Sequence, residues 1–436
     1  MKNCIFLCVF NDEKYLNLLY LFLESLYIST SNLEFSNFDI IIYTSTDFMN
    51  HIKNSNLFTE YIYFELNDTY NDIYKASSAR LDIFNLDLIS NYNKILYLDI
   101  DTIIKGNINK IFDVLRTDDV LYTVQDGSID SDTNYWGKSI FGDEVYNYSD
   151  KSAFTTSILL FNNSEKIKQL FNNINIQYKI ANTKPNAKVF DQGYIIYNAF
   201  KMQIYNNKLL NLYVVNNNFN IYNNFIVYQY SSLVGIYYSK YENMNKFFNN
   251  YLGLLINDNL NLTKKYIKTN YYNIYSHTFG NIVLSKANNI CRLVLNNNIK
   301  TVLKIGFNNS LLFTILMLVS NPNIHIDFVV FDNFTNYEDL NYIKKNFNER
   351  LKVYYIDNFN NIKNMTKYDI IHINDVYFSE IKLYNYCKKN SIIIINNYQN
   401  ISLLWDEYIL KYKLENLDIQ NIKNTNFQNI KKITHI

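Results

Sequence analysis

The chain has 436 residues, more than one ordinary domain holds, so we expect two or three domains. Its 41 Lys and Arg residues balance 40 Asp and Glu residues, and the net charge of +1 argues against a bulk electrostatic binder of nucleic acid or membranes. Hydrophobic residues make up 48% and charged residues 19%, which is typical of a folded globular protein. The four cysteines are scattered without a CxxC pair, which argues against a disulfide scaffold or structural zinc and favours a reducing compartment.

No segment of the chain has the pattern of a secretory signal or of a membrane span. The apolar run at 5–10 is short and is followed at once by polar and charged residues, so it predicts a strand. The longest later apolar run, 311–319, is far shorter than the roughly 20 residues that a membrane span needs. We therefore expect a cytoplasmic protein with no membrane span and no nucleic-acid partner.

Strand and helix patterns alternate over the first hundred residues. Helical spacing of apolar residues predicts helices over 15–27 and 79–89, and apolar runs predict strands over 4–10, 38–43, 62–66 and 94–98. Such alternation indicates an α/β sheet with largely parallel strands. Ligands of these sheets bind at the carboxyl ends of strands, which directs attention to the segments after Phe10, Tyr43 and Leu98.

A second series of α/β patterns begins near residue 286. A helix at 285–295 and a strand at 301–305 are followed by a helix at 311–319, and further strands are predicted at 326–331, 353–356, 370–373 and 391–395. This second series has the length of a normal domain. We therefore place two domains at 1–285 and 286–436, while the Asn- and Tyr-rich residues 200–275 give no clear prediction.

The sharpest chemical feature is a pair of aspartates directly after the predicted strand 94–98. Asp99 and Asp101 are two positions apart, so both carboxylates can approach one divalent cation at the end of the strand. Their hard oxygens suit Mg²⁺ or Mn²⁺, and such a cation can neutralise the charge on a leaving diphosphate. The same Asp-x-Asp pattern is common as a pair of surface acids, so both interpretations stay open at this point.

The segment around these aspartates resembles the core signature of the family 8 glycosyltransferases. That family is a retaining group with the GT-A fold and includes glycogenin and the bacterial lipopolysaccharide galactosyltransferases. Five motifs carry the resemblance in the family's order, over residues 1–285. They are Val9-Phe10-Asn11-Asp12 with Tyr15, Ala79-Arg80-Leu81 with the strand through Asp99-Ile100-Asp101-Thr102, Phe154-Thr155-Thr156-Ser157 with the strand up to Asn162, Asp191-Gln192-Gly193, and His277-Thr278-Phe279-Gly280.

The resemblance implies how a UDP-sugar donor and a metal are bound. Asp99 and Asp101 would hold Mn²⁺, or Mg²⁺ in its place, with His277 as the third ligand. Arg80 would pair with the diphosphate or the sugar, a bidentate task that suits a guanidinium group. Tyr15 would stack on the uracil. The other positions predicted to contact the donor are Val9, Phe10, Asn11, Ile100, Thr155 and Gly280.

The resemblance also implies a catalytic group made of Gln192, Asp191 and Arg80. Asp191 would hydrogen-bond the sugar hydroxyls. Gln192 would lie beneath the anomeric carbon, either as a weak nucleophile or as a carbonyl that stabilises positive charge. Because the transition state of retaining transfer is oxocarbenium-like, the enzyme has to stabilise the leaving UDP and hold the acceptor in place.

Three departures from the family pattern bear on these roles. Thr155 stands where the family has an Asn that contacts the donor sugar, so the identity of the sugar is open. Val283 stands where the family has a Lys after the late Gly, and the next lysine is Lys286. The interval between Gln192 and His277 is also longer than usual, which makes His277 the least secure ligand.

The second series of patterns resembles class I S-adenosylmethionine-dependent methyltransferases over residues 286–420. The matching segments are 301–310, 331–332, 356–357, 369–375 and 392–398. Lys304 occupies the position of an acidic residue, and Gly306 alone remains of the Gly-rich turn. Asparagines replace the expected aspartates at 374, 396 and 397. We therefore predict a degenerate, non-catalytic domain used for packing, for a homodimer or for positioning the acceptor.

The fold class that we predict is α/β, with an N-terminal GT-A domain (a Rossmann-like nucleotide-diphospho-sugar transferase fold) and a C-terminal Rossmann-like methyltransferase-type domain. The predicted function is metal-dependent retaining transfer of a hexose, glucose or galactose by default, from a UDP-sugar to a hydroxyl of a glycan or protein. Two alternatives stay open. One is a bifunctional enzyme that also methylates with S-adenosylmethionine, and the other is a non-catalytic scaffold that binds a sugar nucleotide.

Overall fold

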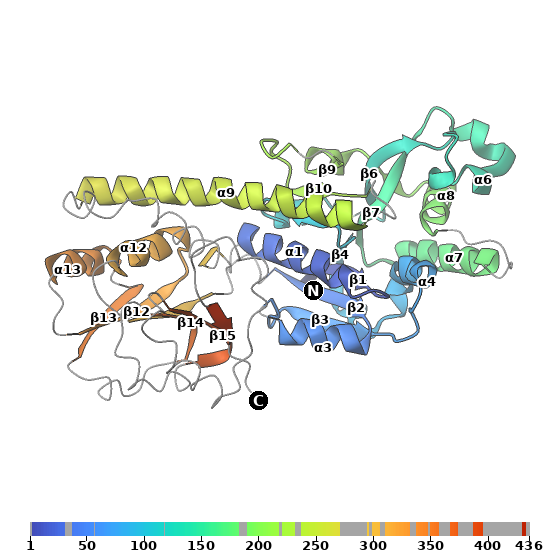
Figure 1. The fold of residues 1–436 in the computed structure, drawn as a ribbon. Coiled ribbons are helices and arrows are strands. Elements are labelled where there is room, and N and C mark those ends of the chain that lie inside the picture. Colours follow the sequence, from blue (N-terminus) through green and yellow to red (C-terminus); the bar gives the residue numbers. More distant parts are fainter. Residues whose placement is uncertain are drawn as a thin grey trace. The chain divides into compact units, whose positions relative to one another are not determined.

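The protein divides into two compact units, Met1–Asn250 and Tyr251–Ile436, in a computed structural model (Figure 1). The residues that the structure describes are 2–30, 37–55, 57–116, 118–182, 190–217, 220–231, 237–270, 294–295, 299–305, 310–331, 337–347, 349–356, 367–373, 387–395 and 430–432. The predicted boundary at 285/286 falls outside these residues and stays a prediction. None of the described helices is both long and apolar enough to cross a membrane.

A seven-stranded mixed sheet forms the centre of the first unit. Its strands lie in the order β3-β2-β1-β4-β7-β6-β8. Their bounds are β1 Lys2–Val9, β2 Phe38–Thr44, β3 Ile62–Leu66, β4 Tyr92–Leu98, β6 Leu121–Ser128, β7 Ser152–Asn162 and β8 Tyr205–Asn206. The first four strands in this order are parallel, whereas β7 is antiparallel to both β4 and β6. The predicted α/β sheet is thus confirmed.

A smaller three-stranded sheet starts directly after the aspartate pair. It contains β5 (Thr102–Ile104), β10 (Val227–Gln229) and β9 (Val214–Asn216), with β10 in the middle. β5 is antiparallel to β10, and Thr102 pairs with Gln229. The aspartates therefore lie in the short link between β4 of the large sheet and β5 of the small one, which limits the freedom of their backbone at both ends.

Helices connect the strands of the first unit. The α-helices are α1 Lys14–Ser29, α3 Thr46–Asn54, α4 Ile73–Ser78, α5 Asn109–Phe112, α6 Lys138–Phe141, α7 Glu165–Asn182, α8 Gln192–Met202 and α9 Tyr237–Asn270, which runs on past the end of the unit. The 3₁₀ helices are η1 Ala79–Asn85, η2 Asp87–Asn91, η3 Asn134–Trp136, η4 Gly142–Tyr148 and η5 Leu209–Leu212.

The predicted amphipathic helix over 79–89 is wrong in its type and its bounds. Asp72 caps an α-helix that starts at Ile73, because its side chain accepts hydrogen bonds from the next helical N–H groups. That helix ends at Ser78, and the chain continues as η1 and η2. Leu86 separates these two with an extended conformation (φ −91°, ψ 132°), which interrupts the helical hydrogen bonds.

The core of the first unit joins the large sheet to helices α7 and α8. Strand residues such as Phe6, Ile95 and Phe161 share one buried cluster with Phe171 of α7 and Phe200 of α8. Residues 4–7 of β1 are all fully buried, so both faces of that strand are covered. The near-continuous apolar runs of the parallel strands follow from this burial on both faces.

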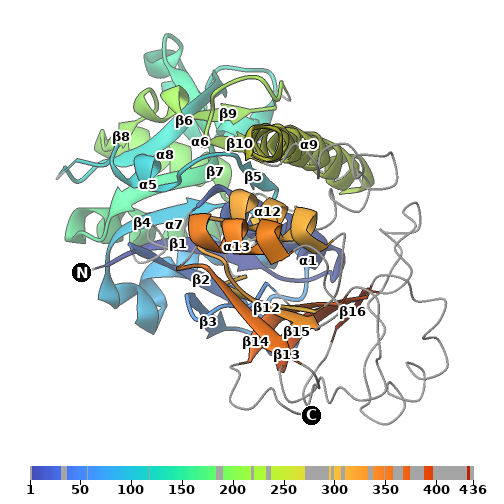
Figure 2. The same cartoon turned by 90° about the vertical axis from the view of Figure 1, so that its left-hand side faces the viewer.

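A six-stranded sheet forms the second unit, in the order β13-β12-β11-β14-β15-β16. Its elements are β11 Thr301–Ile305, α12 Ser310–Ser320, β12 His325–Phe331, α13 Tyr337–Asn346, β13 Leu351–Ile356, β14 Tyr368–Ile373, β15 Cys387–Ile395 and β16 Ile430–Lys432. All pairs are parallel except β15 with β16. Figures 1 and 2 show α12 and α13 on one face of this sheet. The predicted strands and the helix over 311–319 are confirmed here, whereas most of the predicted helix 285–295 lies outside the described residues.

Candidate active site

Backbone hydrogen bonds from two neighbouring strands fix the link that carries the aspartate pair. The Asp99 N–H donates to the carbonyl of Ser157 on β7 over 2.9 Å. The Tyr230 N–H, directly after β10, donates to the carbonyl of Asp101 over 3.0 Å. The Thr102 hydroxyl donates to the Asp99 carbonyl over 2.7 Å. The two aspartates are therefore positioned by the end of β4, the middle of β7 and the end of β10 together.

Asp101 is the more buried of the two aspartates and has two different oxygens. Its Oδ2 accepts from the Lys240 ammonium over 2.5 Å, and each of these side chains is 13% exposed. Its Oδ1 is buried and accepts no hydrogen bond from any described residue. Leaving such an atom unpaired costs about 1–3 kcal/mol, and a carboxylate oxygen is the ligand that Mg²⁺ and Mn²⁺ prefer. The donor set therefore fits a hard divalent cation.

Asp99 lies between a tyrosine and an arginine. The Tyr97 hydroxyl donates to its Oδ1, and Arg80 Nη1 is 3.6 Å from the same oxygen. Burial raises the pKa of Asp99 to about 6, with Arg80 opposing the shift and Asp101 adding to it. The charge of the Asp99 carboxylate therefore depends on its burial and on the charges of Arg80 and Asp101.

Arg80 of η1 joins two motifs that lie 111 positions apart in the sequence. Its Nε and Nη2 donate to the two carboxylate oxygens of Asp191 over 2.6 and 2.7 Å, and its Nη1 donates to the Thr156 carbonyl over 2.7 Å. Arg80 is 8% and Asp191 is 1% exposed. Burial opposes the charge of Arg80, but Asp191, Tyr97 and Asp99 together outweigh it and raise its pKa above the ordinary value. Arg80 and Asp191 thus form a buried ion pair with two charge-assisted hydrogen bonds.

Gln192 begins α8 directly after Asp191, and both ends of its amide are held. Its Oε1 accepts from the Thr156 N–H over 3.2 Å and from the Thr156 hydroxyl over 3.0 Å. Its Nε2 donates to the Tyr135 carbonyl over 3.1 Å. The amide therefore has one fixed orientation.

Two glycines allow the start of α8 to approach η3, the 3₁₀ helix that carries Tyr135. Gly137 has φ +85°, in the left-handed region that glycine favours. A Cβ on Gly193 would lie 2.8 Å from Ile140 Cδ1 and 2.9 Å from Gly137 Cα, closer than side chains pack. The position of Gln192 thus depends on two residues that have no side chain.

A chain of polar side chains lies beneath the aspartates. Thr155 Oγ1 and Ser157 Oγ are 2.8 Å apart, and Ser157 donates to Gln229 Oε1 over 2.9 Å. All three are at most 3% exposed, and Gln229 Nε2 has no hydrogen-bond partner among the described residues. Thr155, a predicted sugar contact, is therefore part of a buried network that includes a residue of β10.

The predicted nucleotide-binding segment follows β1. Phe10 is 3% exposed, and its ring packs edge-on against Tyr43 and Tyr70, each with a centroid distance of 5.1 Å, so the ring is not open to a ligand. Val9 is also buried, and Asn11 is exposed with φ 79°. The half-buried Tyr15 has the Lys14 ammonium over its ring, 5.4 Å from the centroid.

Lys240 connects this segment to the aspartates. Burial opposes its charge, but Asp101, Asp99 and Tyr15 together outweigh burial and raise the pKa of Lys240. The structure thus brings Tyr15, Asp99, Asp101 and Lys240 together, and Arg80 and Asp191 join them through Asp99. Ile100, between the aspartates, is 9% exposed. His277 and Gly280 lie outside the described residues.

Two residues of this site were not found from the sequence. Lys240 and Gln229 lie in the stretch 200–275 that gave no clear prediction. Neither stands in a recognisable motif, and their place in the site depends on how α9 and β10 pack.

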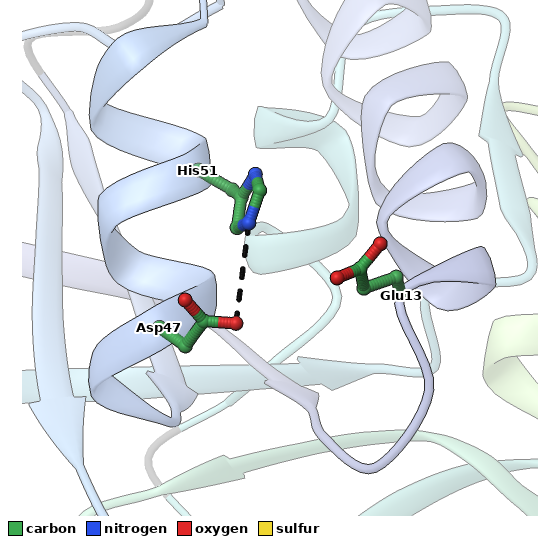
Figure 3. Close-up of side chains that lie close together, drawn as sticks. All are labelled: Glu13, Asp47 and His51. Atoms are coloured by element: carbon green, nitrogen blue, oxygen red, sulfur yellow. Dashed lines mark ion pairs between the residues drawn. The ribbon is translucent and has the colours of Figure 1, made fainter.

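A second group of side chains that could hold a metal ion includes Glu13, between Asn11 and Tyr15 of the predicted nucleotide-binding segment. Glu13, Asp47 and His51 present ligand atoms within 4.8 Å of one another, and Figure 3 shows Glu13 at the start of α1 facing the two residues of α3. His51 Nε2 is 3.9 Å from Asp47 Oδ2, but these side chains are 50% and 71% exposed. Solvent screens such charges, so we assign this cluster no function.

The chain is similar to one protein family model and to several solved structures. No curated protein sequence matches the chain. Among solved structures it is similar to the WbbM bifunctional glycosyltransferase, with 16% identity and a TM-score of 0.40 over 56% of this chain and 49% of that one, so it spans about half of the WbbM chain. It is also similar to the galactosyltransferase LgtC (15%, TM-score 0.39, 56% and 95% covered) and to the glycosyltransferase GlyE of Streptococcus pneumoniae (13%, TM-score 0.36, 91% and 91% covered). Residues 22–206, which include Arg80, both aspartates of the pair and Asp191-Gln192, match the model of glycosyl transferase family 8.

Proposed function

We propose that this domain transfers a hexose, glucose or galactose by default, from a UDP-sugar to a hydroxyl of a glycan or protein, with retention of the anomeric configuration. The observation that carries the proposal is the buried guanidinium of Arg80. It contacts Asp191 at the start of α8 and lies 3.6 Å from Asp99 at the end of β4. The Arg80 guanidinium thereby joins the motif proposed to bind the donor, at Asp99, to the motif proposed to take part in sugar transfer, at Asp191.

Asp99 and Asp101 are the residues that would hold a divalent cation, Mn²⁺ or Mg²⁺. The unpaired Oδ1 of Asp101 supports this assignment, because a ligand that completes the site would remove the cost of its burial. When bound, the cation supplies positive charge to the leaving diphosphate. His277 stays a proposed third ligand.

Arg80 is suited to stabilise charge in the transition state without moving. The described residues use three of its five N–H donors, through Nε, Nη1 and Nη2. The remaining donors, one on each Nη atom, are available to the diphosphate or the sugar. Since Asp191 fixes the guanidinium plane, little side-chain entropy is lost when the donor binds.

Gln192 is better suited to stabilise charge than to attack. Its Oε1 already accepts two hydrogen bonds from Thr156, one for each lone pair of the carbonyl oxygen. A nucleophilic attack would require one of these lone pairs to be released. The negative end of the fixed amide dipole can favour positive charge at the anomeric carbon without that step.

The second unit is proposed to be a non-catalytic Rossmann-like module. Lys304 of β11, at the position where an acidic residue was expected, is 0% exposed and lies 6.0 Å from the centroid of the Phe328 ring. Its side chain is part of the core and is not presented to a cofactor. Isothermal titration with S-adenosylmethionine tests this role, since specific binding would favour the bifunctional alternative.

The experiment for the main proposal is a panel of UDP-sugars incubated with the full chain, with Mn²⁺ or with chelator, followed by measurement of the UDP released. We expect one donor to be turned over and the chelator to stop the reaction. The anomeric proton of the transferred sugar, followed by NMR, then reports retention or inversion. Binding of a donor without turnover, across acceptors, would favour the scaffold alternative.

A further inference from the structure

Lys240 is a largely buried lysine, with 13% of its side chain exposed, and its position is set by the packing of a long helix. It lies in the first turn of α9, and Met244, Phe247 and Tyr251 follow at the spacing of one helix face. These three are 0%, 4% and 7% exposed. Lys240 thus lies on the same helix face as three buried apolar residues.

Aromatic contacts hold this end of α9 beside β10, as Figures 1 and 2 also show. The ring of Phe247 lies 4.6 Å from that of Tyr228 and 6.3 Å from that of Tyr230, measured between centroids. Tyr230 is the residue whose N–H donates to the Asp101 carbonyl. The same packing therefore positions both the backbone of Asp101 and the ammonium that pairs with its carboxylate.

We propose that Lys240 is the resident counter-cation of Asp101 and that it sets the affinity of the aspartate pair for a divalent cation. The inference rests on the proposed function, in which Asp99 and Asp101 hold such an ion. The ammonium lies 2.5 Å from Asp101 Oδ2, so this oxygen is not free for another cation. The buried Oδ1 remains without a partner among the described residues and is where a cation can first bind.

The physical basis is competition between two cations for one carboxylate. Lys240 already neutralises much of the charge of Asp101, so a metal ion bound through Oδ1 shares this carboxylate with the ammonium. The repulsion between the two cations is subtracted from the metal's binding energy. In a partly buried site this ion pair is strong, because little water screens it. Removal of the ammonium should therefore strengthen metal binding, by at least about tenfold in Kd.

The test is Mn²⁺ binding to the full chain without donor, measured by isothermal titration and by the EPR signal of free Mn²⁺. Lys240→Met removes the charge and keeps the length of the side chain, whereas Lys240→Arg keeps the charge. Lys246→Met is the matched control, because Lys246 is an exposed lysine of the same helix. All proteins carry His51→Ala, so that the exposed cluster of Figure 3 does not contribute to the binding.

The expected result is that Lys240→Met binds Mn²⁺ at least about tenfold more tightly than its parent, with Lys246→Met and Lys240→Arg close to the parent. The melting temperature of Lys240→Met should also rise more on addition of Mn²⁺. Equal or weaker binding by a folded Lys240→Met, or no binding by any of the proteins, overturns the inference. Because UDP release is measured separately, turnover without the predicted order of affinities would refute this inference alone, whereas the predicted order without turnover would refute the proposed function alone.

Discussion

The ion pair between Arg80 and Asp191 gives the most quantitative prediction. The two residues are 8% and 1% exposed and are joined by two hydrogen bonds of 2.6 and 2.7 Å. Removal of one partner leaves the other charge buried without compensation, which costs about 3–5 kcal/mol. We expect Asp191→Asn and Arg80→Met each to lower the free energy of unfolding of the first unit by that amount.

A double-mutant cycle separates this pair from other effects of the substitutions. The ion pair can be lost only once. The free energy of unfolding of the double variant, Arg80→Met with Asp191→Asn, should therefore fall by at least about 2 kcal/mol less than the sum of the two single-variant losses. Urea unfolding followed by circular dichroism measures the values, fitted with two transitions because the chain has two units. The exposed pair Lys168–Glu165 is the control, with an expected coupling below about 0.5 kcal/mol. Additive losses for Arg80 and Asp191 would refute the reasoning.

Three further predictions concern other groups. Because burial raises the pKa of Asp99 to about 6, kcat/KM for the donor should fall as the pH drops through 6 and the carboxylate is neutralised; a pH–rate profile that is flat there would contradict this. Gly193→Ala places a Cβ 2.8 Å from Ile140 and should lower stability by about 1–3 kcal/mol, whereas Gly253→Ala, which meets open space in a helix, should raise it by up to about 1 kcal/mol. Thermal unfolding compares the two, and equal shifts would argue against the packing of Gly193. Burial lowers the pKa of Lys304, so the folded protein binds its proton less tightly than the unfolded chain, and Lys304→Met should stabilise the second unit most at low pH and progressively less toward pH 10.5. A gain in melting temperature that does not depend on pH would contradict that assignment.

The sheet could be predicted from the sequence because its strands are buried. Parallel strands covered on both faces give continuous apolar runs, and the predicted strands 38–43 and 301–305 fall on the buried strands β2 and β11. The helix 79–89 failed because apolar spacing does not distinguish an α-helix from two 3₁₀ helices separated by one extended residue, Leu86. Cap geometry at Asp72 and the conformation of Leu86 decide that difference.

Only those residues of the candidate site that stand in recognisable sequence motifs could be predicted. Arg80, Asp99 and Asp191 stand in recognisable segments, and the structure brings them together. Lys240 is one of 41 basic residues and has no local pattern, so its burial follows from the contacts of α9 with β10. The amide of Gln192 likewise needed the structure, since its hydrogen bonds to Thr156 and Tyr135 join segments far apart in the chain.

The central claim is that the carboxylate of Asp101 is needed for release of UDP from a sugar donor. The most direct measurement compares UDP release by the wild type, Asp101→Asn and Asp113→Asn at saturating Mn²⁺, with the fold of each protein checked by circular dichroism. Asp113 is an exposed aspartate of the same unit and serves as the matched control. We predict that Asp113→Asn retains the wild-type rate of UDP release and that Asp101→Asn lowers this rate by at least about a hundredfold. A folded Asp101→Asn protein with the wild-type rate would contradict the account.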